Sequence, residues 1–282
     1  MLTKPFKKIG IGVTFSPNLK ANIYEASRLA LMFHSNLVLI HVGEKSNDSE
    51  SEFLKILNPF IQKGLAFEII FKPGDPVNAI LTATKENNID LLILGALKRE
   101  NFLKYYVGSI ARKITRQAQC SVLLLIGPSI EKQPYKNVVV NGLKDPKTKQ
   151  TIEIAYYVTH QLKSEKITIV EEIKQDEVDV KVDDDKSLRK ANIVKERIKL
   201  REASRIKDII GKIPSEYTTN IITKSQPIFG KQGYSIGHYA QIVRADLLIM
   251  NAPSKMTFWD RLFPHDIEHI LTELPTDVLI IQ

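Results

Sequence analysis

Cysteine is almost absent from this chain, since Cys120 is the single one among 282 residues. An intrachain disulfide is therefore excluded, and a reducing compartment such as the cytoplasm is expected. No hydrophobic run reaches the roughly 18 residues that a membrane-spanning helix needs. The first residues also lack the apolar core of a signal peptide. These absences predict a cytoplasmic protein without a membrane partner.

Negative charge is in the minority, with 32 Asp and Glu against 40 Lys and Arg, and the net charge is +8. The positive excess is spread over both halves of the chain and forms no basic arm. Patterns typical of nucleic-acid-binding modules, such as zinc fingers, are missing. The sequence therefore favours other partners over nucleic acid.

One stretch of the sequence occurs twice. The segment D-L-L-I-L-G-A from Asp90 has a weaker copy, D-L-L-I-M-N-A, from Asp246. Gly108 and Pro264 keep the same spacing of 156 residues. A constant spacing without insertions indicates two copies of one folded unit. The first copy has glycines where a phosphate could approach the backbone, and the second copy has lost them.

The first half alternates short apolar segments with amphipathic ones. Apolar runs predict strands, and apolar residues three or four apart predict helices. Near-continuous apolar strands separated by helices indicate a parallel sheet covered on both faces, and right-handed crossovers then give a doubly wound sheet. Strands are expected over residues 8–14, 36–42, 66–72, 90–95 and 121–126, with helices over 22–33, 51–63, 77–87 and 109–117.

A linker from Gly127 to Pro134 separates this half from the second. We therefore expect two α/β domains, residues 1–128 and residues 134–282. The second half is predicted to form strands over residues 136–141, 166–170, 217–224, 245–251 and 276–281, with helices over 152–162, 187–212 and 236–243.

Residues 171–185 are rich in acidic side chains but lack the glycine and the ligand spacing of a calcium loop. A solvated loop or extended strand is therefore preferred over a metal site. The following amphipathic helix is expected to begin with Ser187 as its N-cap and to present its lysines and arginines to solvent.

Six segments of the first half occur in a characteristic order, and in this order and spacing they resemble the universal stress protein family in its tandem two-domain form. The resemblance implies two Rossmann-like domains, each with a five-stranded parallel sheet in the order 3-2-1-4-5 and helices on both faces. It also implies that the two fifth strands pair within the chain, as an intramolecular pseudo-dimer, and it leaves a homodimer open. The six segments are Val13-Thr14-Phe15-Ser16, Ile40-His41-Val42, Gly74-Asp75-Pro76, residues 90–95, Gly108-Ser109 and residues 120–126.

Nucleotide-binding members of this family carry a loop of the form G-x2-G-x9-G-[ST], and this chain has Gly95, Lys98, Gly108 and Ser109 at those positions. The resemblance implies a pocket for ATP with Mg²⁺, or for another adenine nucleotide. Independently, the free N–H groups and the dipole of a helix start attract an anion. The residues expected to bind nucleotide are Thr14, Phe15, Ser16, Val42, Gly95, Lys98, Gly108, Ser109 and Ile110.

Two departures from the family pattern affect this pocket. Lys98 replaces the second glycine, and its side chain either supplies charge to a phosphate or fills the space that the phosphate needs. Thr14 and, in the second half, Asn141 stand where the family has an acidic residue, so hydrogen bonding remains and the negative charge is lost.

The second half departs further from the pattern. Asn251 replaces the first glycine, Ser254 stands at the position of Lys98, and Pro264-His265 replaces Gly108-Ser109. Proline removes a backbone N–H, so this copy should hold a phosphate poorly.

Other chemical signals are weak. The segment from His265 to His269 has the H-x-x-E-H pattern of a zinc-peptidase class, but a third ligand is missing from the few residues that follow. Cys120 precedes a buried strand and is interpreted as a small apolar residue. We therefore expect no metal site, no catalytic residues and no enzymatic activity.

The expected function is stress-response regulation, with weak adenine-nucleotide binding in the first domain, no turnover and a protein partner that the sequence does not identify. The alternative is a protein-interaction module that has lost both nucleotide pockets. In that case the glycine turn at Gly108 serves packing alone.

Overall fold

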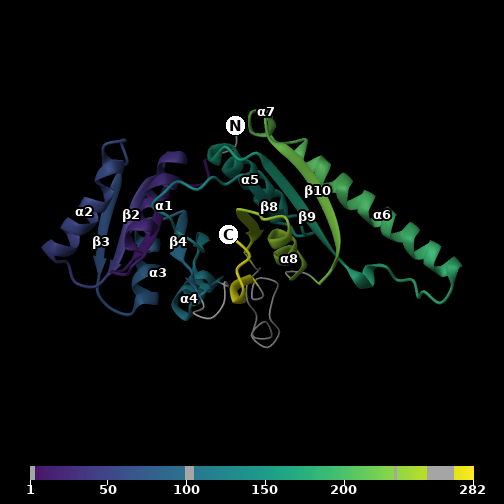
Figure 1. Ribbon diagram of the computed structural model, residues 1–282, viewed down its shortest axis with the longest axis horizontal. Helices are drawn as coiled ribbons and strands as arrows, with labels where there is room; N and C mark the ends of the chain where they lie inside the picture. The colour runs from purple at the N-terminus through teal and green to yellow at the C-terminus, as the bar shows by residue number, and fades with distance from the viewer. Residues whose placement is uncertain (1–3, 99–104, 232–233, 253–269) are drawn as a thin grey trace. The chain divides into compact units, whose positions relative to one another are not determined.

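A computed structural model describes residues 4–98, 105–231, 234–252 and 270–282. Over these ranges the chain is an α/β protein of mostly parallel strands with flanking helices (Figure 1), as expected. Its contacts divide into two compact units. The first unit contains the described residues up to Pro134 and also Leu271–Gln282, and the second unit is Tyr135–Ile270.

The first unit is built around six strands in the order β12-β7-β4-β1-β2-β3. All neighbours run parallel except β12, which is antiparallel to β7. A separate short pair, β5 with β6, lies between β4 and α4 in the chain. The strands are β1 (Lys8–Val13), β2 (Asn36–Val42), β3 (Phe67–Lys72), β4 (Leu91–Gly95), β5 (Leu97–Lys98), β6 (Tyr105–Tyr106), β7 (Ser121–Leu125) and β12 (Asp277–Ile281).

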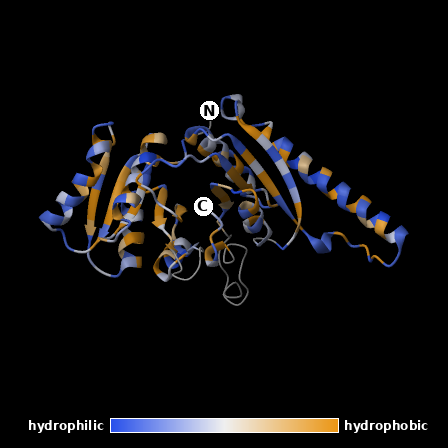
Figure 2. Cartoon of the chain, viewed as in Figure 1, coloured by the Kyte–Doolittle hydropathy of each residue, from blue (hydrophilic) through white to orange (hydrophobic). Residues whose placement is uncertain are grey.

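Four helices cover this sheet: α1 (Leu19–Met32), α2 (Asn47–Ile61), α3 (Pro76–Glu86) and α4 (Ser109–Gln117). Helix α1 contacts α2, and α3 contacts α4. Because the crossovers proceed from β1 in opposite directions and are right-handed, the two pairs lie on opposite faces. The hydropathy colouring shows the strands as the apolar part of the unit (Figure 2), since residues such as Ile9, Leu39 and Leu92 are fully buried between these layers.

The second unit has four parallel strands in the order β10-β9-β8-β11. These strands are β8 (Asn137–Asn141), β9 (Lys166–Lys174), β10 (Ile222–Gly230) and β11 (Leu247–Asn251). Its helices are α5 (Thr148–Leu162), the 3-10 turn η1 (Gln175–Glu177), α6 (Asp185–Ile210), α7 (Ser215–Thr218) and α8 (Tyr234–Ile242). The order β10-β9-β8-β11 corresponds strand by strand to the order β3-β2-β1-β4 of the first unit.

The last strand differs from the expected division of the chain. Residues 134–282 were expected to form one domain with its own five-stranded sheet, which stays a prediction, and the contacts group Leu271–Gln282 with the first unit. The expected pairing of the two closing strands is present, with Leu279 opposite Leu123 in antiparallel register. The physical reason is the edge of β7, whose unpaired backbone groups are satisfied by a strand from the end of the chain.

Two element boundaries in the second unit also differ from expectation. The strand predicted over 217–224 begins later, at Ile222, because residues 215–218 form the short helix α7 after Pro214. Strand β10 includes Pro227, which is tolerated because β10 lies at a sheet edge. Helix α6 begins at Asp185, and its N-cap is Asp184 instead of Ser187; Ser187 takes the other position of a capping box.

The segment over residues 171–185 was predicted to be a solvated loop or an extended strand, and its first part is a strand. Strand β9 continues to Lys174, so Glu171 and Glu172 are buried, at 2% and 5% exposure. The exposed part begins at η1. None of the described helices combines the length and the apolar composition that a bilayer crossing requires.

Cys120 offers a test of where β12 belongs. It is buried, and burial raises the pKa of its thiol to about 11, so the folded protein should resist thiol reagents near neutral pH. Leu279→Ala removes a buried side chain from β12 and should lower the free energy of unfolding by about 2–5 kcal/mol. In mild urea we expect thiol reagents to label Cys120 faster in the Leu279→Ala variant than in the wild type, although Cys120 and Leu279 are far apart in sequence.

The matched control is Ile222→Ala, which truncates an exposed strand residue of the second unit. It should leave the labelling rate of Cys120 unchanged. Equal labelling in the wild type and the Leu279→Ala variant would contradict the assignment of β12 to the first unit.

Candidate functional site

The candidate site lies at the carboxyl ends of β1 and β4, which are neighbours in the parallel sheet of the first unit. From β1 the chain crosses to β2 on one side, and from β4 it continues to β7 on the other side. Ligands of open α/β sheets bind at such a switch point, because the loops after the two strands diverge there. The loops here start at Thr14 and Ala96.

The loop after β1 presents Thr14, Phe15 and Ser16 to solvent, and all three are exposed. The Phe15 ring is 52% exposed, so one face is accessible. Its other face stacks on the fully buried Phe53 at 5.3 Å between centroids and 11° between planes. An aromatic ring is thus held at the edge of the site with a surface on which a planar group can stack.

His41 supports this ring from the end of β2. Its centroid lies 5.4 Å from that of Phe15 in an edge-to-face arrangement. Its Nδ1 lies 3.1 Å from the Val13 carbonyl oxygen and donates to it. This hydrogen bond ties the end of β2 to the end of β1. Val42, which follows His41, is half-buried.

Gly95 ends β4 and is exposed. A β-carbon at this position would lie 3.5 Å from Asn22 Oδ1. That amide oxygen belongs to the first turns of α1 and is buried without a hydrogen-bond partner among the described residues. An unsatisfied buried oxygen indicates a place where a donor, such as water or a ligand, completes the structure.

Gly108 and Ser109 form the start of α4. Gly108 is the N-cap, and no side chain caps the helix. The first intrahelical bond is donated by Arg112 to Gly108 O at 2.8 Å, so the N–H groups of residues 109–111 have no intrahelical acceptor. Ser109 and Ile110 are exposed. These free N–H groups and the helix dipole favour an anion here.

Leu97 contacts the helix start, a role that the sequence did not reveal. A β-carbon at Gly108 would lie 2.8 Å from Leu97 Cδ1, closer than side chains tolerate. A side chain at position 108 would therefore require the half-exposed Leu97 side chain to move aside. For Lys98, the structure describes the backbone, which pairs with Tyr105 in the β5–β6 pair, and its side chain lies outside the described part.

The C-terminal segment holds the backbone that leads into Gly108. Val107 N donates to Leu271 O at 3.1 Å, and Leu274 N donates to Tyr105 O at 3.0 Å. The Arg112 guanidinium, on α4, also donates to Leu271 O at 3.1 Å. The position of the helix start is therefore set by residues more than 150 positions further along the chain.

The structure thus brings most of the predicted residues to one edge of the sheet. Residues 14–16 follow β1, and Gly95 ends β4. The helix start at residues 108–110 follows β6, and Val42 ends β2, the neighbour of β1. Sequence reasoning missed Asn22 and Leu97. Asn22 follows the loop after β1 at the position of a first helical turn, but an asparagine there carries no distinctive signal.

The second unit fills its corresponding edge with polar side chains. Asn251, at the end of β11, has its Nδ2 3.2 Å from Thr148 Oγ1 and 3.4 Å from Asp145 Oδ1. Asn141, at the end of β8, is 1% exposed and accepts a hydrogen bond from Leu143 N at 3.0 Å. A carboxylate and a packed amide in this place disfavour a phosphate. The positions 254 and 264–265 of the degenerate motif lie outside the described residues.

Buried carboxylates form a second polar cluster in this unit, between α6 and β9. Glu171 accepts a hydrogen bond from Ser225 Oγ at 2.9 Å, and its Oε2 has no partner among the described residues. Glu202 on α6 pairs with Arg205 at 2.8 Å, and Arg205 also donates to Gly142 O. Burial raises the pKa of Glu171, against a smaller lowering by Ser225 and Arg205.

Within the described ranges, no three His, Cys, Asp or Glu side chains gather as metal ligands would. The zinc-like pattern from His265 to His269 lies outside those ranges.

Comparison with known proteins gives one family. Residues 54–125 match the model of the Universal stress protein family. Universal stress protein YxiE of Bacillus subtilis (strain 168) is 28% identical over 88 residues, which cover 30% of this chain and 60% of that protein. The chain spans about three fifths of the length of the curated relatives that it matches.

Two solved structures resemble almost the whole chain. A universal stress protein from Archaeoglobus fulgidus DSM 4304 has a TM-score of 0.71 at 14% identity, covering 100% of this chain and 99% of that one. The Pseudomonas aeruginosa PAO1 protein PA1789, of unknown function, has a TM-score of 0.69 at 16% identity, covering 99% and 93%. At these identities the likeness concerns the fold. The family match lies inside the first unit, so residues 54–125 of that unit belong to the universal stress protein family.

The contact between Leu97 and Gly108 predicts a coupled pair. Gly108→Ala should lower the free energy of unfolding by about 1–3 kcal/mol, because the added methyl group collides with Leu97. Leu97→Ala should remove most of that cost in the double variant. Gly127→Ala is the control, since the nearest atom to a β-carbon there is Tyr105 Oη at 3.9 Å. Additive effects of the two substitutions in urea unfolding would contradict the packing role of Gly108.

The raised pKa of Glu171 predicts a pH-dependent effect of Glu171→Gln. The folded state holds the carboxyl proton more tightly than the unfolded state, so ionisation reduces wild-type stability as pH rises above the ordinary carboxyl pKa. Glutamine does not ionise. The stability of the variant relative to the wild type should therefore increase from about pH 5 to about pH 8.

Urea unfolding at both pH values measures this difference. Glu165→Gln is the control, because Glu165 is exposed and pairs with an exposed lysine, Lys136, and its effect should stay within about 0.5 kcal/mol at both pH values. A Glu171→Gln difference that is constant or falls with pH would refute the assigned direction.

Proposed function

We propose that this protein is a stress-response regulator whose first unit binds an adenine nucleotide, with Mg²⁺, weakly and without turnover. The observation that carries the proposal is the uncapped start of α4 beside the carboxyl ends of β1 and β4. Three free N–H groups there form an anion site, and Ser109 adds a hydroxyl donor. Family membership supports a role in stress response.

The groups around the helix start suit the remaining parts of a nucleotide. The exposed face of Phe15 can stack on a base. Thr14 and Ser16 offer hydroxyls to the ribose or phosphates. Asn22 Oδ1 lacks a donor that a ligand or a bound water would supply. The missing acidic residue at position 14 and the contact of Leu97 with Gly108 favour weak affinity.

The second unit serves structure or partner binding in this proposal, because Asn251, Asp145 and Thr148 close its corresponding edge. The matching order of strands and the repeated sequence segments support an origin of both units by duplication.

Ser109→Pro tests the site at a single backbone group. Proline is well tolerated at the first position of a helix, and the extended conformation of Gly108 (φ −61°, ψ 163°) suits a residue before proline. The variant therefore loses one free N–H and the hydroxyl without unfolding α4. We expect ATP affinity to fall about tenfold or more in this variant. In Ser109→Ala, which loses the hydroxyl alone, the affinity should fall less.

Asn47→Pro provides the matched control at the first position of α2, where Ser46 is also extended (φ −129°, ψ 152°). It should leave ATP affinity unchanged. The measurement is thermal unfolding and calorimetric titration with ATP and Mg²⁺, in which a hundredfold excess over Kd stabilises by about 2.7 kcal/mol. Absence of any shift at millimolar ATP would reject the pocket and favour the interaction module. Steady release of phosphate from ATP would instead show that the protein hydrolyses the nucleotide, against the proposal.

Lys98→Gly separates the two roles of that lysine. Tighter ATP binding in this variant would show that the side chain obstructs the phosphate site, and weaker binding would show that it supplies charge.

A further inference from the structure

Helix α6 carries an unusual concentration of positive charge. It has 26 residues, against 15 in α2, and its sequence contains nine Lys and Arg against four Asp and Glu. In Figure 1 it runs along β10, and its buried residues lie along one side: Ala191, Ile198, Glu202 and Ile206. This anchored side fixes which residues point outward.

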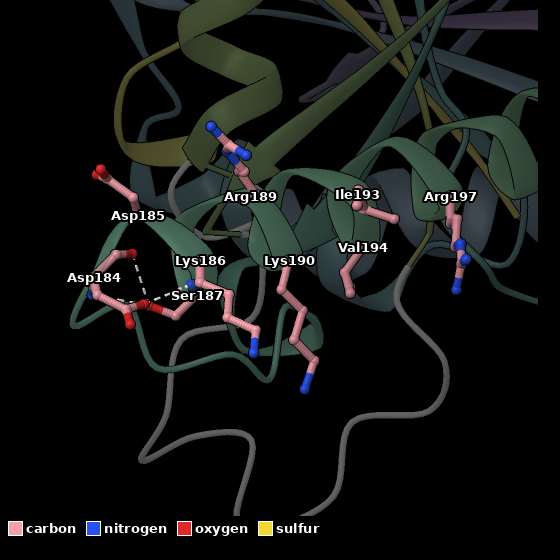
Figure 3. Close-up of a pocket in the computed structure, with 9 residues that line it drawn as sticks. All are labelled: Asp184, Asp185, Lys186, Ser187, Arg189, Lys190, Ile193, Val194 and Arg197. Carbon is pink, nitrogen blue, oxygen red and sulfur yellow. Dashed lines mark hydrogen bonds between the residues drawn. The ribbon is translucent and has the colours of Figure 1, made fainter.

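The outward side carries a basic–aliphatic stripe, which we define as Lys186, Lys190, Ile193, Arg197 and Leu200. Successive members are three or four positions apart, so they share one face of the helix. Figure 3 shows the first turns of α6, where the side chains of Lys186, Lys190 and Arg197 extend to the same side.

The two aliphatic members are unusually exposed. Ile193 is 54% exposed and Leu200 is 70% exposed. They stand two helical turns apart, Ile193 in the middle of the stripe and Leu200 at its C-terminal end. Isolated exposed aliphatic residues need no explanation. Here, however, both lie among cations that have no ion pair in the described part of the chain.

Four other cations of α6 have partners in the described part of the chain. Lys199 pairs with Glu196 at 2.7 Å, Arg201 and Arg205 pair with Glu202, and Lys195 lies over the Phe229 ring. The charges of Lys186, Lys190 and Arg197 are therefore left for a ligand outside the unit.

We propose that this stripe docks the protein on the surface of an anionic lipid bilayer. The three cations face acidic headgroups, and each contributes about a fivefold gain in affinity near an anionic surface. Ile193 and Leu200 enter the boundary between headgroups and acyl chains, as the apolar residues of interfacial helices do. Such a contact needs no membrane-spanning helix, and it departs from the expectation of no membrane partner.

The composition of the stripe favours a bilayer over nucleic acid. Phosphate contacts along a nucleic acid need cations alone, and two exposed aliphatic side chains between them would remain in water. Base stacking uses aromatic side chains, and the stripe has none. The aliphatic pair therefore distinguishes the two kinds of partner in an experiment.

Vesicle sedimentation with the full chain tests the proposal. The probes are vesicles of phosphatidylcholine alone and of phosphatidylcholine with phosphatidylserine, at low and high salt. We expect binding to the mixed vesicles at least about tenfold stronger than to the neutral ones, and weakened by salt. Two variants divide the stripe. The charge variant combines Lys186→Glu, Lys190→Glu and Arg197→Glu, and the aliphatic variant combines Ile193→Ser and Leu200→Ser. Each should reduce binding about tenfold or more.

The matched control lies on α2, where Leu54 is 40% exposed and Lys55 is exposed. Leu54→Ser with Lys55→Glu should bind vesicles like the wild type, and thermal unfolding should show that all variants remain folded. Equal binding to neutral and acidic vesicles, or none to either, would overturn the proposal. The proposal would also be overturned if the charge variant lost vesicle binding while the aliphatic variant kept it. If the aliphatic variant also bound duplex DNA as the wild type does, the stripe would be assigned to nucleic acid.

Discussion

The antiparallel pairing of β12 with β7 is the constraint on which the first unit depends. Without it, β7 would present a row of unpaired backbone groups at the edge of an apolar sheet. The pairing also extends beyond the strands. Ile126 N donates to the Asp277 carboxylate at 2.8 Å, and Leu271 and Leu274 bond the backbone from Tyr105 to Val107. One segment therefore closes the sheet and positions the start of α4.

The two units show how one strand order can carry different chemistry. In the first unit, the ends of β1 and β4 lead to exposed hydroxyls, a glycine and free helical N–H groups. In the second unit, the end of β8 carries Asn141, whose amide oxygen accepts from the backbone. The end of β11 carries Asn251, whose amide nitrogen donates to Asp145 and Thr148. The topology creates the crevice, and a few side chains decide whether a charged ligand fits it.

The sequence predicted most of the fold because the signals are local. Apolar runs such as the one from Leu91 to Leu94 are long and uninterrupted, and Gly108 marks the helix start. What it missed depends on contacts between distant segments. The packing of Leu97 on Gly108 and the burial of Glu171 are set by the folded arrangement. Acidic composition predicted a solvated loop or an extended strand around Glu171. The residue lies in a strand, and Ser225 and Arg205 make its buried carboxylate tolerable.

The separation of β7 and β12 in the sequence has a consequence for biosynthesis. The ribosome makes β7 (Ser121–Leu125) long before β12 (Asp277–Ile281), while domains generally fold as their residues emerge. The first unit must therefore wait, with the edge of β7 open, until β12 has emerged. During that interval the edge is available to the β12 segment of a neighbouring nascent chain, so polysomes are where exchange of this strand between two copies would arise.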